Sequence, residues 1–60
     1  MSQTRVLIVD DDSDLLQALP EALRLRMGEV TVDTADSGPA ALDRIAARDY
    51  DAIEIGRAHV

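Results

Sequence analysis

The stretch RVLIVDDDSDLL, residues 5–16, decides the fold. Its apolar part, residues 6–9, is unbroken and rich in β-branched side chains, which is typical of a strand that is buried on both faces. Four acids then follow within five positions: Asp10, Asp11, Asp12 and Asp14. Negative charge is therefore crowded at the end of a strand that is expected to be buried.

A helix is predicted directly after these acids. Residues 13–27 carry apolar side chains at helical spacing, and Gly28 is placed to end the helix. Pro20 lies inside this segment, so we expect a kink or a late helix start, because proline lacks an amide donor and crowds the preceding turn. The buried stripe is expected to contain Leu15, Leu16, Leu19, Ala22, Leu23 and Met27.

The second half of the chain repeats this alternation. Residues 30–35 predict a second strand, Ser37 is placed to cap a second helix, and residues 50–53 begin a third strand. The buried stripe of the second helix is expected to be Ala41, Leu42 and Ile45. The order βαβαβ predicts a parallel sheet with right-handed crossovers, hence an α/β, partial doubly wound architecture.

Composition limits the classes of function. Sixty residues allow one small domain, and the chain has no cysteine for a disulfide or thiolate site. A formal net charge of −6 with scattered arginines argues against direct nucleic-acid binding. The absence of a long apolar run or a secretion signal argues against a membrane segment and predicts a cytoplasmic location.

The acids themselves suggest a cation site. Asp10 and Asp11 fall at the carboxyl end of the first strand, the edge at which open α/β sheets bind ligands. Adjacent carboxylates repel each other, so a bound cation would favour their charged forms, and oxygen ligands of this kind suit Mg²⁺. Asp12 and Asp14 have a simpler interpretation, since an acid at a helix start caps it or favours its positive end.

A calcium loop of the EF-hand kind is the competing interpretation. Asp10, Asp12, Asp14 and Glu21 hold the appropriate acidic positions. However, the position that requires glycine is Leu15, and a strand precedes the loop in place of a helix. We therefore do not expect calcium binding.

The segments VLIVDDD and TADSGPAALDRIAARDYDAI together resemble the amino-terminal half of a response-regulator receiver domain from two-component signalling. The resemblance covers residues 5–53 and implies a flavodoxin-like fold with sheet order 2-1-3. It further implies that Asp11 is a direct Mg²⁺ ligand and that Asp10 acts partly through bound water. In this family a histidine kinase or phosphotransfer protein supplies a phosphoryl group to an aspartate after the third strand.

The chain departs from the family at that aspartate. The phosphoacceptor is expected at the position held by Gly56, and Glu54 falls about 7 Å short of it at strand spacing. We therefore expect no phosphoacceptor in this chain and no enzymatic activity of its own. The chain is interpreted as a fragment whose intact parent acts in a phosphorelay.

The last residues have a different character. IGRAHV, residues 55–60, matches one reading frame of a common sequencing-library adapter, in which a stop codon follows. We expect residues 1–54 to belong to a receiver domain and residues 55–60 to be a non-native tail, with Glu54 encoded by a hybrid codon. His59, within this tail, has no ligand partners near it in the sequence.

Two other interpretations stay open. The chain could be a pseudo-receiver that binds a partner through its first helix without phosphorylation. It could also be the opening βαβ unit of a nucleotide-binding or phosphohydrolase enzyme, although no glycine-rich turn follows VLIV and the consecutive acids lack the alternating pattern of a phosphohydrolase. In each case, three strands and two helices bury little apolar surface, so we expect weak or partial folding of the isolated chain.

Overall fold

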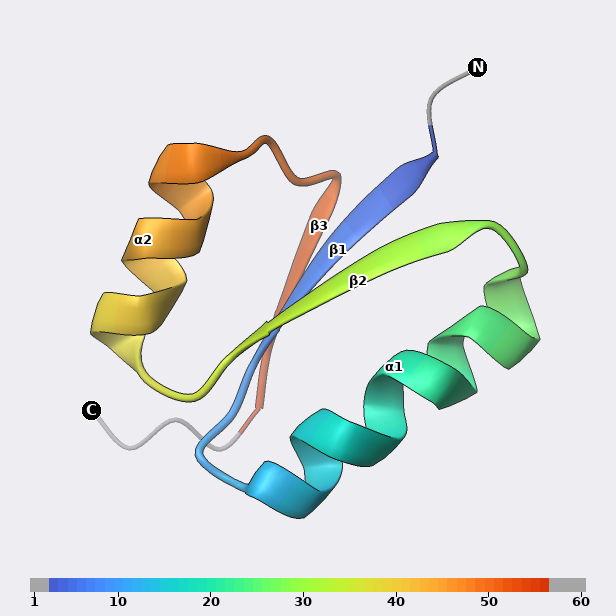
Figure 1. Cartoon of the computed structure of the whole chain (residues 1–60), viewed down its shortest axis with the longest axis horizontal. Coiled ribbons are helices and arrows are strands. Elements are labelled where there is room, and N and C mark those ends of the chain that lie inside the picture. Colours follow the sequence, from blue (N-terminus) through green and yellow to red (C-terminus); the bar gives the residue numbers. More distant parts are fainter. Residues whose placement is uncertain (1–2, 57–60) are drawn as a thin grey trace.

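The computed structural model describes residues 3–56. In chain order the elements are β1 (Thr4–Val9), α1 (Ser13–Met27), β2 (Val30–Ala35), α2 (Gly38–Ala47) and β3 (Ala52–Ile55). The three strands form one parallel sheet in the order β2-β1-β3, and the two helices cover opposite faces of it (Figure 1). This arrangement confirms the predicted α/β, partial doubly wound fold and its strand order.

The central strand β1 explains why an unbroken apolar run was needed. Its residues Val6, Leu7, Ile8 and Val9 are all buried. Side chains alternate along a strand, so two of them face each helix. One core cluster joins Leu7 and Val9 to Ala35 and Ala41, beneath α2; the other joins Val6 and Ile8 to Val30, with α1 side chains packed against it.

Helix α1 begins at Ser13 despite the proline in its interior. Of the two expected effects of Pro20, the late start is excluded and the kink stays a prediction; Pro20 itself is buried within the helix. Gly28 ends the helix with φ of +78°, a conformation that other residues rarely adopt, and its amide donates to the Arg24 carbonyl at 2.9 Å.

The apolar stripe of α1 is narrower than predicted. Leu16, Leu19 and Leu23 pack against the core cluster beneath this helix. Leu15, Ala22 and Met27 are exposed, which corrects their assignment to the buried stripe. The covered face of α1 is therefore limited to these three leucines and the buried Pro20.

Helix α2 has the predicted cap but a different buried face. The Ser37 hydroxyl accepts from the Ala40 amide at 3.2 Å, as expected of an N-cap. Ala41 is buried, whereas Leu42 and Ile45 are 68% and 42% exposed, so their predicted burial is wrong. Small side chains bring α2 close to the sheet, and the larger ones are left at its margin.

Strand β3 is an edge strand, and all four of its residues are exposed. It runs one residue beyond the predicted domain boundary, because Ile55 pairs with Val9. Residues 57–60 of the expected non-native tail, His59 among them, lie outside the described residues. The pairing of Ile55 does not bear on whether that tail is native, so its origin stays a prediction.

Candidate functional site

The first two acids have different environments at the carboxyl end of β1. Asp10 is 3% exposed, and its amide donates to the Ala35 carbonyl at 3.1 Å, which holds this position next to the end of β2. Its Oδ1 accepts from the Asp12 amide at 2.9 Å. Asp11 is exposed. The backbone therefore turns the Asp10 side chain inward and the Asp11 side chain toward solvent.

The next acids belong to the start of α1. Asp12 is the N-cap residue, and its Oδ1 accepts from the Asp14 amide at 3.0 Å and from the Leu15 amide at 3.4 Å. Asp14 lies in the first helical turn, where its charge favours the positive end of the helix dipole. The capping interpretation of Asp12 is confirmed. These residues form a strand end and a helix start, which is not the helix-loop-helix frame of a calcium loop.

Gly56 completes this edge of the sheet. Its amide donates to the Val9 carbonyl at 2.8 Å, which places the chain just beyond β3 beside the residue that precedes Asp10. A Cβ added to Gly56 would overlap the Asp10 carboxylate and lie 2.9 Å from its Cγ. Position 56 therefore lies in direct contact with Asp10, although glycine supplies no side chain there.

Glu54 does not replace the missing side chain. It is paired with Ile8 and lines an apolar groove beside α1, together with Leu19 and Leu23. That groove lies on the face of the sheet that α1 covers, whereas Asp10 and Asp11 lie at the carboxyl end of β1. The prediction that Glu54 is not a phosphoacceptor stays in place.

Asp10 and Asp11 offer the carboxylate oxygens that magnesium prefers, but they are only two residues. Within residues 3–56, no three acidic, histidine or cysteine side chains converge as a metal-binding group. Asp10 and Asp11 supply carboxylate oxygens from one turn of backbone, and Mg²⁺ commonly takes one or two carboxylates with water and phosphate oxygens in its other positions. The two acids therefore fit a magnesium ion that is completed by other ligands.

A polar cluster that the sequence analysis missed joins the end of α2 to β2. The Tyr50 hydroxyl donates to Asp33 Oδ2 at 2.6 Å, and Arg48 lies 3.6 Å from the same oxygen. Burial raises the pKa of the Tyr50 phenol, and the hydrogen bond to Asp33 raises it further. This cluster fixes the segment that leads into β3.

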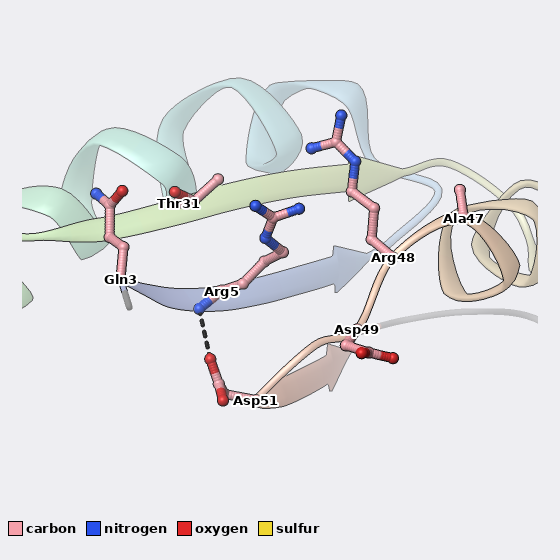
Figure 2. Close-up of a pocket in the computed structure, with 7 residues that line it drawn as sticks. All are labelled: Gln3, Arg5, Thr31, Ala47, Arg48, Asp49 and Asp51. Atoms are coloured by element: carbon pink, nitrogen blue, oxygen red, sulfur yellow. Dashed lines mark hydrogen bonds between the residues drawn. The ribbon is translucent and has the colours of Figure 1, made fainter. Parts of the chain in front are cut away.

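A shallow pocket lies near the other end of the sheet, away from Asp10 and Asp11 (Figure 2). Figure 2 shows the Arg5 amide donating to Asp51, at 2.8 Å, and the Asp51 amide donates in return to the Arg5 carbonyl at 2.8 Å. Arg48 and Asp49 also line the pocket, so its charges are mixed. Its visible role is to hold the start of β3 against β1.

No family model matches the chain, and neither a curated protein nor a solved structure matches it. Among the helices of residues 3–56, none has the length and apolar character needed to cross a membrane.

Proposed function

We propose that this chain is the amino-terminal part of a response-regulator receiver domain. Its intact parent accepts a phosphoryl group from a histidine kinase or phosphotransfer protein in the cytoplasm. The acceptor is an aspartate at the position held here by Gly56. The observation that carries this proposal is the contact between position 56 and the buried carboxylate of Asp10.

The strand ends explain how such a site would be assembled. Adjacent parallel strands end at the same edge of a sheet, so a side chain after β3 meets the acids that follow β1. Phosphoryl transfer depends mainly on positioning and on neutralising the phosphoryl oxygens. A side chain at position 56 would lie against the Asp10 carboxylate, which has to shift to admit it.

The two acids are suited to different tasks. Asp11 is exposed and can offer its carboxylate directly to a cation. Asp10 is buried and holds the turn into α1 through the Asp12 amide, so it orients the site and acts on a cation partly through water. Magnesium, when bound, supplies the positive charge that the phosphoryl oxygens require.

The chain with glycine at position 56 is not expected to accept phosphate. Glycine has no carboxylate, and the carboxylate of Glu54 belongs to the groove beside α1. The proposed phosphorelay role therefore concerns the parent protein, and nothing in it requires this chain to be an enzyme or to bind nucleic acid.

Two measurements on the parent test this proposal. The source locus should encode aspartate at position 56 and should not encode IGRAHV there. Magnesium titration of the intact parent, followed by calorimetry, should show binding that Asp11→Asn weakens at least about tenfold, because a direct ligand is lost. An uninterrupted gene that encodes residues 55–60 as they stand, or unchanged affinity in both Asp10→Asn and Asp11→Asn, would refute it.

A pseudo-receiver is the second candidate, favoured by the outer surface of α1. Leu25 is 83% exposed there and lines a shallow pocket with Gln17, Glu21 and Arg24. A large apolar side chain at such exposure suits a contact with another protein. Capture of this sixty-residue chain by a kinase docking domain, lost in Leu25→Glu and retained in Leu42→Glu, would favour this candidate.

A further inference from the structure

We propose that the carboxylate of Asp51 latches β3 to β1, and that β3 opens as a unit while the other four elements stay folded. Opening would carry position 56 away from Asp10, so Asp51 controls the contact between the ends of β1 and β3. This inference concerns the sixty-residue chain itself and does not depend on the receiver proposal.

The hydrophobic core does not include β3. Both clusters of buried side chains are built from β1, β2 and α2, and side chains of α1 pack against one of them. All four residues of β3 are exposed, and within residues 3–56 this strand pairs only with β1. The side chains that hold the two helices to β1 and β2 would therefore keep their contacts with one another if β3 opened.

Side-chain packing contributes little to the docking of β3. On one face of the sheet, a groove of about 420 Å³ is lined by Leu19 and Leu23 of α1 and by Glu54 of β3. Side chains on opposite sides of an open groove make few dispersion contacts. On the other face, Ile53 and Ile55 are 45% and 65% exposed. Hydrogen bonds to β1 are therefore the main attachment of this strand.

Asp51 makes a reciprocal contact with Arg5 at the start of β3. The Arg5 amide donates to Asp51 Oδ2 at 2.8 Å, the bond drawn in Figure 2, and the Asp51 amide donates to the Arg5 carbonyl at 2.8 Å. At the other end of the strand, the Gly56 amide donates to the Val9 carbonyl at 2.8 Å. These bonds tie both ends of β3 to β1, and the bond to the carboxylate depends on a single side chain.

The residue before Asp51 is anchored separately. The Tyr50 hydroxyl donates to Asp33 of β2 at 2.6 Å, and the Tyr50 side chain packs against the core cluster that contains Leu7 and Val9. Neither contact involves β3. We therefore expect the chain to open between Tyr50 and Asp51 and to leave α2 in place.

Opening of β3 would change the environment of Asp10. Gly56 directly follows β3, so it lies against the Asp10 carboxylate only while that strand is paired. Asp10 is 3% exposed in the docked chain. The open chain should therefore expose this carboxylate, because the backbone of position 56 no longer covers it.

Native-state hydrogen exchange, measured by NMR at urea concentrations below the unfolding midpoint, tests this opening. The Gly56 amide bonds Val9, whereas the Asp10 amide bonds Ala35 of β2. Gly56 should be protected at least about tenfold less than Asp10, and its protection should depend less on urea, because opening β3 exposes less surface than unfolding the chain. Equal protection and equal dependence on urea at the two amides would overturn the proposal.

A substitution in α1 tests whether β3 opens alone. Ala22 is exposed within this helix, which stays folded in both the docked and the open chain. Ala22→Gly should therefore speed exchange of the Asp10 amide about fourfold and leave that of Gly56 unchanged within about 1.5-fold. Equal acceleration at the two amides would show that β3 opens only when the whole chain unfolds.

Substitutions at Asp51 test the latch. Asp51→Ala removes a bond that only the docked chain contains, so exchange of the Gly56 amide should be about fivefold faster or more. Asp51→Asn keeps a side-chain oxygen that can accept from the Arg5 amide and should restore most of the protection. Asp49→Ala is the matched control, because it removes the same charge at an exposed position of the same pocket. Gly56 exchange that is no faster in Asp51→Ala than in Asp49→Ala would overturn the role of Asp51.

Discussion

The backbone of Gly56 lies against the buried carboxylate of Asp10. The Gly56 amide donates to the Val9 carbonyl at 2.8 Å, and a Cβ on Gly56 would lie 2.9 Å from Asp10 Cγ. The space between the ends of β1 and β3 is thus occupied by one side chain, that of Asp10. This contact links the acids to the position where the proposed function needs an aspartate, and it has consequences for stability.

Gly56→Ala is expected to destabilise the chain by about 1 to 3 kcal/mol, because the new methyl group must displace the Asp10 carboxylate or break the bond to Val9. Urea unfolding followed by circular dichroism measures this change. The double variant Gly56→Ala with Asp10→Ala should lose less than the sum of the single changes, because the overlap is gone.

Gly38 supplies the matched control. A Cβ there meets nothing within 4 Å, and Gly38 lies in the first turn of α2. Gly38→Ala should therefore be neutral or stabilise the chain by up to about 1 kcal/mol. If the two alanine substitutions had equal effects, the contact between Gly56 and Asp10 would not exist in solution.

Asp12→Ala is expected to lower the free energy of unfolding by about 1 kcal/mol, because the amides of Asp14 and Leu15 lose their acceptor at the start of α1. Thermal unfolding followed by circular dichroism measures it. Asp11→Ala is the control and should stay within about 0.5 kcal/mol of the parent chain, since Asp11 is exposed. Equal losses in both variants would contradict the capping role.

Stability should fall at alkaline pH through Tyr50. The folded chain raises the pKa of this phenol, so its contribution is complete below the unfolded value of about 10 and is lost as pH rises through the higher folded value. Urea midpoints measured between about pH 8 and pH 12 should show this decline. Tyr50→Phe should remove most of the decline over the same range; an identical slope in that variant would rule out Tyr50 as its source.

Leu7→Ala is expected to abolish the cooperative unfolding transition. Leu7 is fully buried at the centre of the sheet, and its truncation costs about 2 to 5 kcal/mol, which is comparable to the whole stability of a domain this small. Leu25→Ala, at an 83% exposed position, should leave the midpoint unchanged within error. A transition that survives in Leu7→Ala would show that the core lies elsewhere.

The elements themselves could be predicted because their signals are local. The unbroken run at residues 6–9 is typical of a strand covered on both faces, and the caps Asp12 and Ser37 stand directly before their helices. The buried stripes of the helices were predicted too broadly. Leu15 and Leu42 have helical spacing, but a sheet of three strands is too narrow to cover them.

The site was only partly predictable for a related reason. Spacing placed Asp10 and Asp11 at the strand end, but only the path of the chain buries one and exposes the other. The hydrogen bond between Tyr50 and Asp33 joins residues that are 17 positions apart. It depends on the path of the chain from α2 to β3, which brings Tyr50 to Asp33 of β2. Such contacts have no periodicity in the sequence from which they could be predicted.

Intact-mass spectrometry of the parent protein, expressed from its source locus, tests the central claim most directly. After incubation with magnesium and a small phosphodonor such as acetyl phosphate, we predict the addition of one phosphoryl group on an aspartate at the position of Gly56, lost when magnesium is chelated. A parent that gains no phosphoryl group, or gains it at another residue, would contradict the account.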